Sequence, residues 1–188
     1  NNNIIINDNN SLNISAGYPF TFALWFKPND SAGGGIALKN GQYGFQWNGS
    51  SSAISYFSNS YHSSQNNSWN LDEWYHIAMV QSGTHVYFYI NGQLDSDSPE
   101  TYSPAFVSDD LHIGKHPSYW GAFDGKIDDV SIWSSALTQS EIQTNMHIEL
   151  TGNEQDLVGY WNFNEGTGTT LIDQTSNGND GTLYGATW

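Results

Sequence analysis

The chain has 188 residues, of which 37% are hydrophobic and 15% aromatic, enough to bury a core without disulfides, and it contains no cysteine. Four Lys and Arg residues stand against 19 Asp and Glu, a formal net charge of −15, which argues against nucleic acid and anionic lipid as partners and favours cations and neutral glycans. No apolar run approaches the ~20 residues of a membrane span, so we expect no membrane insertion.

Strands are predicted wherever apolar and polar residues alternate between turn formers. In the first part of the chain these segments are Ile4–Ile6, Phe20–Phe26, Gln42–Trp47 and Ala53–Phe57. The Gly-rich stretch up to Gly35 and the polar stretch 58–70 are predicted as loops, and Asn48-Gly49 as a hairpin turn.

The second half of the chain continues the same pattern. Predicted strands cover 73–80, 85–90, 111–114, 126–133 and 156–163, with a type I′ turn at Asn91-Gly92. One helix is predicted over 139–146, because Thr138 and Glu141 form a capping box and Ile142 and Met146 share a face. Many short strands with one short helix indicate an all-β, two-sheet antiparallel sandwich.

Four ordered segments carry a family resemblance. They are Phe20-Thr-Phe-Ala-Leu-Trp-Phe-Lys-Pro28; Trp74–Val80 with Val86–Gly92; Leu111–Gly114 with Phe123–Trp133, Ala136 and Leu137; and Leu157–Phe163 through Gly166-Thr-Gly168 and 173–181. Together they resemble the laminin-G-like family of the concanavalin A-like jelly roll. The resemblance implies a jelly-roll sandwich, a structural calcium, and use in bacterial glycan-degrading or adhesive proteins.

We interpret residues 1–188 as a single laminin-G-like domain cut from a longer exported protein, because the chain opens with Asn1-Asn2-Asn3 and shows no signal peptide. Such a module would be tethered to other domains of the same chain. The lack of cysteine favours a bacterial protein that is secreted or held at the cell surface.

Calcium is the predicted metal. Asp173, Thr175 and Asn177 alternate before Gly178 and Asn179, as in the opening half of a calcium loop, so Asp173, Asn177 and Asn179 are candidate ligands. The alternative is an ordinary Asx/Gly turn. Asp128 and Asp129 are a second candidate pair: they either bind the metal or hydrogen-bond a turn, and a β-bulge there would restore the strand register.

A glycan site is predicted in the loop that follows Lys115. Tyr119 and Trp120 would stack on pyranose faces, with help from His116. Tyr43, Trp47 and Trp69 are candidate additions, as is Tyr61. Alternatively, Trp120 folds back as a lid on the core. The strand tryptophans (Trp25, Trp74, Trp133 and Trp161) and His76 are interpreted as core residues.

Catalysis is not expected. Glycosidases need two carboxyl groups at a defined separation, and the Glu-x-Asp-x-x-Glu strand of related jelly-roll glucanases is absent, as is a Gly-x-Ser-x-Gly motif. The sequence thus predicts a non-catalytic, calcium-stabilised carbohydrate-binding module for a polysaccharide or surface glycan. The alternative is a structural or adhesive module of a bacterial surface protein without its own glycan site.

Overall fold

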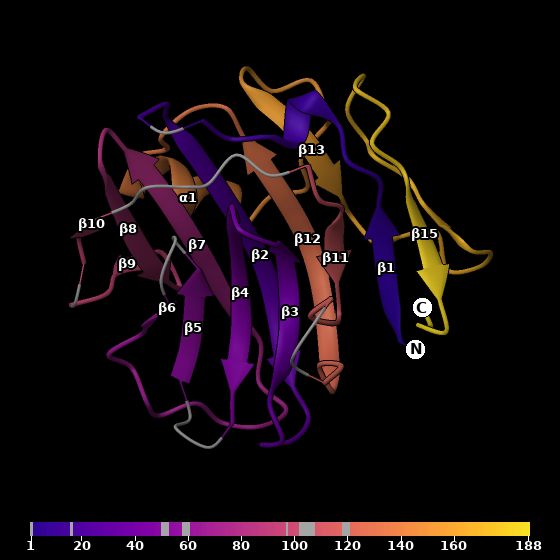
Figure 1. Ribbon diagram of the computed structural model, residues 1–188, viewed down its shortest axis with the longest axis horizontal. Coiled ribbons are helices and arrows are strands. Elements are labelled where there is room, and N and C mark those ends of the chain that lie inside the picture. The colour runs from indigo at the N-terminus through magenta and orange to yellow at the C-terminus, as the bar shows by residue number, and fades with distance from the viewer. Residues whose placement is uncertain are drawn as a thin grey trace.

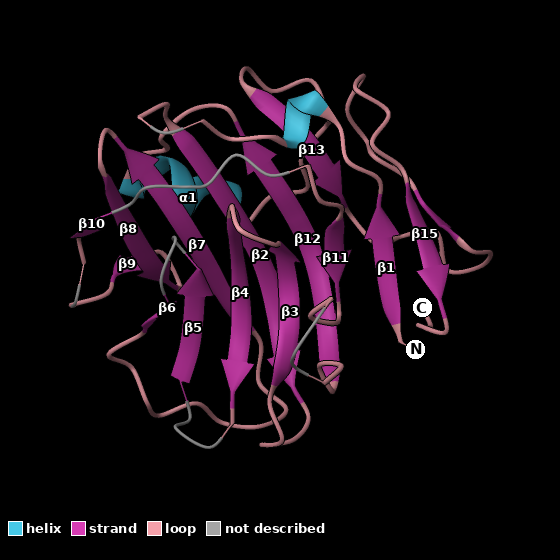
Figure 2. Ribbon diagram, viewed as in Figure 1, coloured by secondary structure: helices cyan, strands magenta, loops and turns pink. Residues whose placement is uncertain are grey.

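Two antiparallel sheets face each other across one core, which confirms the predicted sandwich (Figures 1 and 2). The computed structural model describes residues 2–15, 17–49, 53–57, 61–96, 98–101, 108–117 and 121–188. Within these ranges, no helix is long and apolar enough to cross a bilayer.

Sheet A has eight strands and sheet B has seven. The spatial order of sheet A is β14 (Thr170–Leu171), β15 (Gly181–Tyr184), β1 (Asn3–Ile6), β11 (Leu111–Ile113), β3 (Gly34–Lys39), β4 (Tyr43–Asn48), β5 (Ala53–Phe57) and β6 (Tyr61–Ser63). The order of sheet B is β10 (Glu100–Thr101), β8 (His85–Ile90), β7 (Tyr75–Ser82), β2 (Phe20–Pro28), β12 (Gly125–Trp133) and β13 (Leu157–Trp161), and β9 (Gln93–Leu94) pairs with β8.

Alternation along each strand decides which side chains enter the core, because successive residues point to opposite faces of a sheet. The core side chains of β2 are Phe20, Phe22, Leu24 and Phe26, and those of β4 are Tyr43, Phe45 and Trp47. The rings of Phe22 and Phe45 stack between the two sheets with centroids 5.1 Å apart. Aromatic side chains therefore supply much of the buried apolar surface.

Strand β3 was not predicted, because its first residues belong to a Gly-rich stretch that reads as a loop. Its first two residues must be glycines, because the backbone of other segments passes too close to leave room for a Cβ atom. A Cβ on Gly35 would lie 2.3 Å from the His116 nitrogen, and one on Gly34 would lie 2.6 Å from the Ala122 carbonyl oxygen. A second unpredicted strand is β6, within the polar stretch that follows β5.

The predicted helix is present as α1 (Gln139–Asn145), and its capping box is confirmed. It lies on the outer face of sheet B, where Ile142 packs against Ala23, Ala78 and Val80. The predicted turn that joins β8 and β9 is also confirmed, since Asn91 and Gly92 both have positive φ. Gln139 and Gln143 donate to the carbonyl of Gly92 at 3.0 and 2.9 Å, and these bonds fix the helix on that turn.

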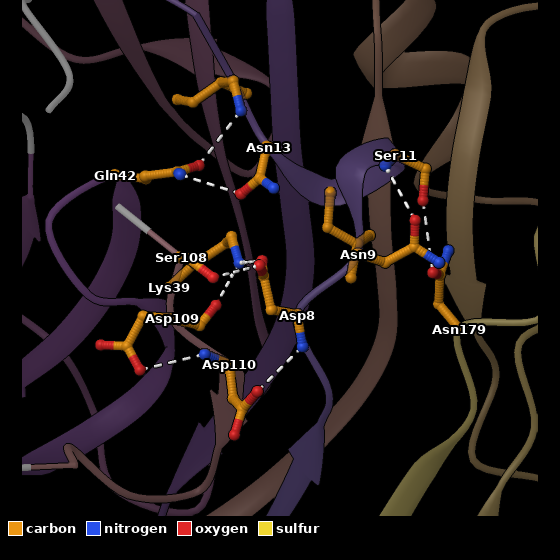
Figure 3. Close-up of polar contacts among 12 residues, drawn as sticks. Asp8, Asn9, Ser11, Asn13, Lys39, Gln42, Ser108, Asp109, Asp110 and Asn179 are labelled. Carbon is orange, nitrogen blue, oxygen red and sulfur yellow. Dashed lines mark hydrogen bonds and ion pairs between the residues drawn. The ribbon is translucent and has the colours of Figure 1, made fainter. Parts of the chain in front are cut away.

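The segment after β1 includes the 3₁₀ helix η1 (Asn10–Leu12), places Leu12 in the core and is held by the polar contacts drawn in Figure 3. Lys39 is fully buried there, and its ammonium donates to Asp8 Oδ1 at 2.5 Å and to the carbonyl of Asp109. Asp8 also accepts from Ser108 Oγ at 2.7 Å. These hydrogen bonds hold the pKa of Asp8 below its usual range.

Candidate functional site

The predicted calcium loop is a closed hydrogen-bonded turn. Asp173 is 5% exposed, and its Oδ1 accepts from the backbone nitrogens of Tyr160 at 3.1 Å and Thr175 at 2.9 Å. Its Oδ2 accepts from Thr175 Oγ1 and from the Asn179 nitrogen, both at 2.9 Å. A carboxylate offers about four lone-pair positions, so these four donors fill them.

The two asparagines predicted as calcium ligands are also held by hydrogen bonds. Asn177 and Asn179 both donate side-chain amides to the carbonyl of Val158, at 3.0 and 3.2 Å. Asn179 Oδ1 accepts from Ser11 Oγ at 3.2 Å (Figure 3), and its backbone carbonyl accepts from Trp161 Nε1 at 2.9 Å. As arranged, Asp173 and Asn179 do not offer calcium ligands, because their oxygens already accept hydrogen bonds that tie the loop to β13 and η1.

The second candidate pair, Asp128 and Asp129, lies on a β-bulge, as the odd spacing of its neighbours predicted. Against β2, Asp128 pairs with Trp25 but Ser131 pairs with Ala23, so β12 contains one extra residue. Asp129 takes φ of 48°, a conformation that Asp tolerates better than most residues. The bulge places both carboxylates at a groove on the outer face of sheet B.

This groove has a volume of about 310 Å³ and is the candidate functional site. Its wall is formed by the bulge of β12, the segment after α1 and the segment after β13; the lining residues are Asp128, Asp129, Met146, His147, Ile148, Glu149, Asn162 and Asn164. Across it, the amides of Asn162 and Asn164 donate to Glu149 Oε1 at 3.3 and 3.1 Å. Carboxylates and amides at one opening can accept from, and donate to, the hydroxyl groups of a ligand.

The groove is strongly acidic. Burial, with the charge of Asp129 as a second cause, raises the pKa of Asp128 from 3.8 to about 6. Burial also raises the pKa of Asp129, partly offset by the Tyr160 hydroxyl, which donates to Asp129 Oδ1 at 2.6 Å. In the part of the chain that the structure describes, however, no three Asp, Glu, His or Cys side chains come together closely enough to hold a metal ion.

Behind the groove lies an inner chamber of about 20 Å³ that shares Asp129, Met146 and Ile148 with it. Trp25 and His76 line this chamber, with their rings in an edge-on contact at 5.4 Å. Trp25 Nε1 donates to the carbonyl of Met146 at 3.2 Å, which holds the segment after α1 against the sheet.

Two tryptophans that were interpreted as core residues lie instead on the outer face of sheet B. Trp25 is only partly buried, and Trp74 is 41% exposed. The alternation itself carried this signal, because Phe22, Leu24 and Phe26 face inward and Trp25 must then face outward. The other two, Trp133 and Trp161, are buried as predicted.

The predicted glycan-binding aromatics do not form a surface. Tyr43, Trp47 and Trp69 are 0%, 1% and 9% exposed, and His116 is 2% exposed. Their rings are not available to stack on a sugar, because β4 points Tyr43 and Trp47 into the core beside Phe45. Tyr119 and Trp120 lie outside the described residues, as does the side chain of Tyr61.

His76 is buried as predicted, at 6% exposure, but its Nδ1 has no hydrogen-bond partner. Burial lowers its pKa from 6.5 to about 4, and the nearby His147 adds to the effect. The imidazole is therefore neutral at pH 7. The groove and its chamber were missed by sequence reasoning, since their residues come from three separate segments that only the fold brings together.

Comparisons with known proteins agree with this architecture. The laminin G model of the "Concanavalin A-like lectin/glucanases superfamily" matches residues 1–143. The match ends before the groove segment 146–149 and before β13, although β13 pairs with β12 in sheet B. No curated protein matches the sequence.

Three solved structures are similar in fold. A candidate carbohydrate binding protein from Bacteroides ovatus ATCC 8483 has a TM-score of 0.76 and 17% identity; the likeness covers 97% of this chain but only 56% of that protein. Trypanosoma rangeli sialidase has a TM-score of 0.54 and 17% identity over 68% of this chain and 22% of its own. The heptameric SAP-like pentraxin of Limulus polyphemus has a TM-score of 0.51 and 18% identity over 76% and 80%.

Identities this low establish likeness of fold alone. The family is established by the sequence model, which covers most of the chain, and by the two-sheet sandwich that the residues build. This chain belongs to the concanavalin A-like lectin/glucanase superfamily.

Proposed function

We propose that this chain is a non-catalytic carbohydrate-binding module that works outside the cell, secreted or at the cell surface. The observation that carries the proposal is the groove of about 310 Å³, with three carboxylates and two side-chain amides at one opening. Sugars present many hydroxyl groups that both donate and accept, and a polar groove of this kind can satisfy several of them at once. The superfamily and the fold of the Bacteroides ovatus protein support the same class of ligand.

Two tryptophans on the outer face of sheet B extend the proposed site. Trp25 pairs with Asp128 on one side and with His76 on the other, so an acidic, an indole and an imidazole side chain lie in one row across the outer face of sheet B. Trp74 precedes His76 by two residues on the same face, and neighbouring strands lie about 4.8 Å apart. One or two pyranose rings could thus reach from Trp74 to Asp128.

Calcium is not part of the proposed binding step. The oxygens of Asp173 and Asn179 already accept hydrogen bonds, so a metal at that loop would have to displace them. Calcium binding elsewhere stays a prediction, which measuring glycan affinity in calcium and in chelator tests directly.

Hydrolysis is the second candidate function, favoured by one observation: a carboxyl group with a pKa of about 6, Asp128, stands beside another carboxyl group. A raised pKa suits a general acid. Binding without hydrolysis is the better supported, since Asp129 follows Asp128 directly and is held by Tyr160, whereas a glycosidase places its two carboxyl groups on either side of the scissile bond.

The test begins with a glycan array and continues by calorimetry on the glycans that bind. Trp74→Ala and Asn164→Ala should each weaken binding about tenfold, the effect of a lost stacking or hydrogen-bonding anchor. Both residues are exposed, so the melting temperature should stay unchanged. Trp188→Ala and Asn153→Ala, at exposed positions away from the groove, are the matched controls.

Incubation of the bound glycan with the protein should release no new reducing ends. Unchanged affinity in both Trp74→Ala and Asn164→Ala would reject this site. Release of reducing ends that Asp128→Asn abolishes would replace binding by hydrolysis as the function.

A further inference from the structure

The groove is lined by three carboxylates and no lysine, and the one imidazole in its lining is that of His147. Asp128, Asp129 and Glu149 line it, while the only cationic residues of the chain (Lys27, Lys39, Lys115 and Lys126) all lie among the described residues and none lines it. The three ion pairs found in the described ranges involve other carboxylates. The negative charge of the site is therefore left for a ligand to neutralise.

The bulge brings two negative charges close together in a partly buried position, which disfavours the charged forms of both carboxyl groups. Asp128 and Asp129 are adjacent, partly buried and directed to the same opening, and Asp128 Oδ1 accepts only the backbone N–H of Asp129, at 3.0 Å, among the contacts of the described residues. Burial is the first cause of the raised pKa of both carboxyl groups, and at Asp129 the Tyr160 hydroxyl offsets part of it. A positive group bound here would favour both charged forms.

The inner chamber gives an independent sign of a missing partner. His76 lines the chamber at 6% exposure, and its Nδ1 finds no hydrogen-bond partner among the residues that the structure describes. Buried polar atoms are rarely left unpaired. The chamber, at about 20 Å³, has room for one water, and it shares Asp129, Met146 and Ile148 with the groove.

We propose that the groove selects a sugar that carries a free, protonated amine, that is, an amino sugar without an N-acetyl group. This inference rests on the proposed function and names its ligand class. An ammonium group donates three hydrogen bonds and accepts none, which matches an opening rich in carboxylates. An acidic sugar is repelled by the same groups, and an N-acetylated sugar brings no charge.

The experiment compares three β-1,4-linked oligosaccharides of equal length, built from glucosamine, N-acetylglucosamine and glucose, which differ only at carbon 2. Calorimetry is run at about pH 6.5, where a large fraction of the sugar amines and of the Asp128 carboxyl groups is charged, and physiological salt screens acids beyond about 8 Å. The glucosamine oligomer should bind at least about tenfold more tightly than the other two, the effect of about 1.4 kcal/mol from one partly solvated charge pair.

Asp128→Asn keeps the shape of the groove and removes one charge. It should weaken binding of the glucosamine oligomer about tenfold and change binding of the glucose oligomer less than about twofold. Asp156→Asn removes the same charge at an exposed position before β13, at the opposite end of that strand from Asn162, and should change neither.

Three results would overturn the inference. Equal affinity for the three oligosaccharides, or an equal loss for all of them in Asp128→Asn, would leave glycan binding intact but remove the amine preference. An equal loss in Asp156→Asn would mean that the net charge of −15, and not the groove, attracts the cation. Failure of the proposed function itself looks different, because then Asn164→Ala would not alter the binding of any glycan.

Discussion

Replacing Asp173 by Asn should destabilise the protein by about 3–5 kcal/mol. The carboxylate is buried and accepts four hydrogen bonds, two on each oxygen. Asn keeps one accepting oxygen and turns an amide N–H₂ toward two donors, so two bonds to a charged acceptor are lost, each with a net contribution of about 1.5–3 kcal/mol. That loss is a large part of the ~5–15 kcal/mol stability of a typical domain.

Urea unfolding followed by tryptophan fluorescence measures the effect, in calcium and in EDTA. We expect the wild-type midpoint to be the same in both, and the loss in Asp173→Asn to persist in EDTA, because the turn is held by hydrogen bonds. Asp180→Asn is the control: Asp180 is exposed and accepts one bond, from the Asp173 nitrogen, so its loss should stay near 1 kcal/mol or below.

Two results would refute this reasoning. A loss below about 1 kcal/mol in Asp173→Asn would mean that the four bonds do not hold the loop. A wild-type protein that is weakened by EDTA to the level of Asp173→Asn would establish this loop as a calcium site.

Three further variants test the electrostatics of the fold. Because the native pKa of Asp128 is about 6 and its ordinary value is 3.8, ionisation of this group lowers the stability of the folded state as the pH rises between these values. Urea unfolding should therefore show Asp128→Asn to be more stable than the wild type by about 1 kcal/mol at neutral pH, after allowing for solvent screening. At pH 4 the two proteins should not differ in this way. The pH dependence expected for His76 is the opposite, because its native pKa of about 4 lies below the ordinary 6.5 and the folded state therefore loses stability as the pH falls from 6.5 to 4. In a thermal-unfolding series over this pH range, the loss of stability should be smaller by about 2 kcal/mol in His76→Gln than in the wild type. Lys39→Met, which removes the buried ammonium from Asp8, should lower the free energy of unfolding by about 1–3 kcal/mol, and an unchanged value would mean that this ion pair does not contribute to stability.

The fold could be predicted because its signals are local. Period-2 alternation located most strands, Thr138 and Glu141 located the helix, and the odd spacing from Ile127 to Val130 located the bulge. Strand β3 was not predicted, because its glycines make room for the backbone of residues 116 and 122, and no local sequence pattern indicates that those residues lie beside it.

The site could be predicted only in fragments. Asp128 and Asp129 were recognised as an unusual pair, but Glu149 and Asn162 reach the same groove from other segments, and their approach depends on how α1 docks. Exposure of aromatic residues was misjudged in the strands even though alternation in β2 and β4 separates inward-facing from outward-facing rings. Trp69 differs, because it lies in a loop and its burial depends on distant parts of the chain.

The pairing of β1 has a consequence for folding during synthesis. Ile4 pairs with Ile113 on one side and with Leu183, which is made much later, on the other. At about 5–20 residues per second, β1 must wait on the order of 10 s or more for its second neighbour, and such non-local pairing also slows folding once the chain is free. Until β15 arrives, sheet A has an open edge beside an apolar strand of three consecutive isoleucines, the kind of edge on which chains aggregate. The nascent protein therefore depends on being kept apart from its copies until its last strand has emerged.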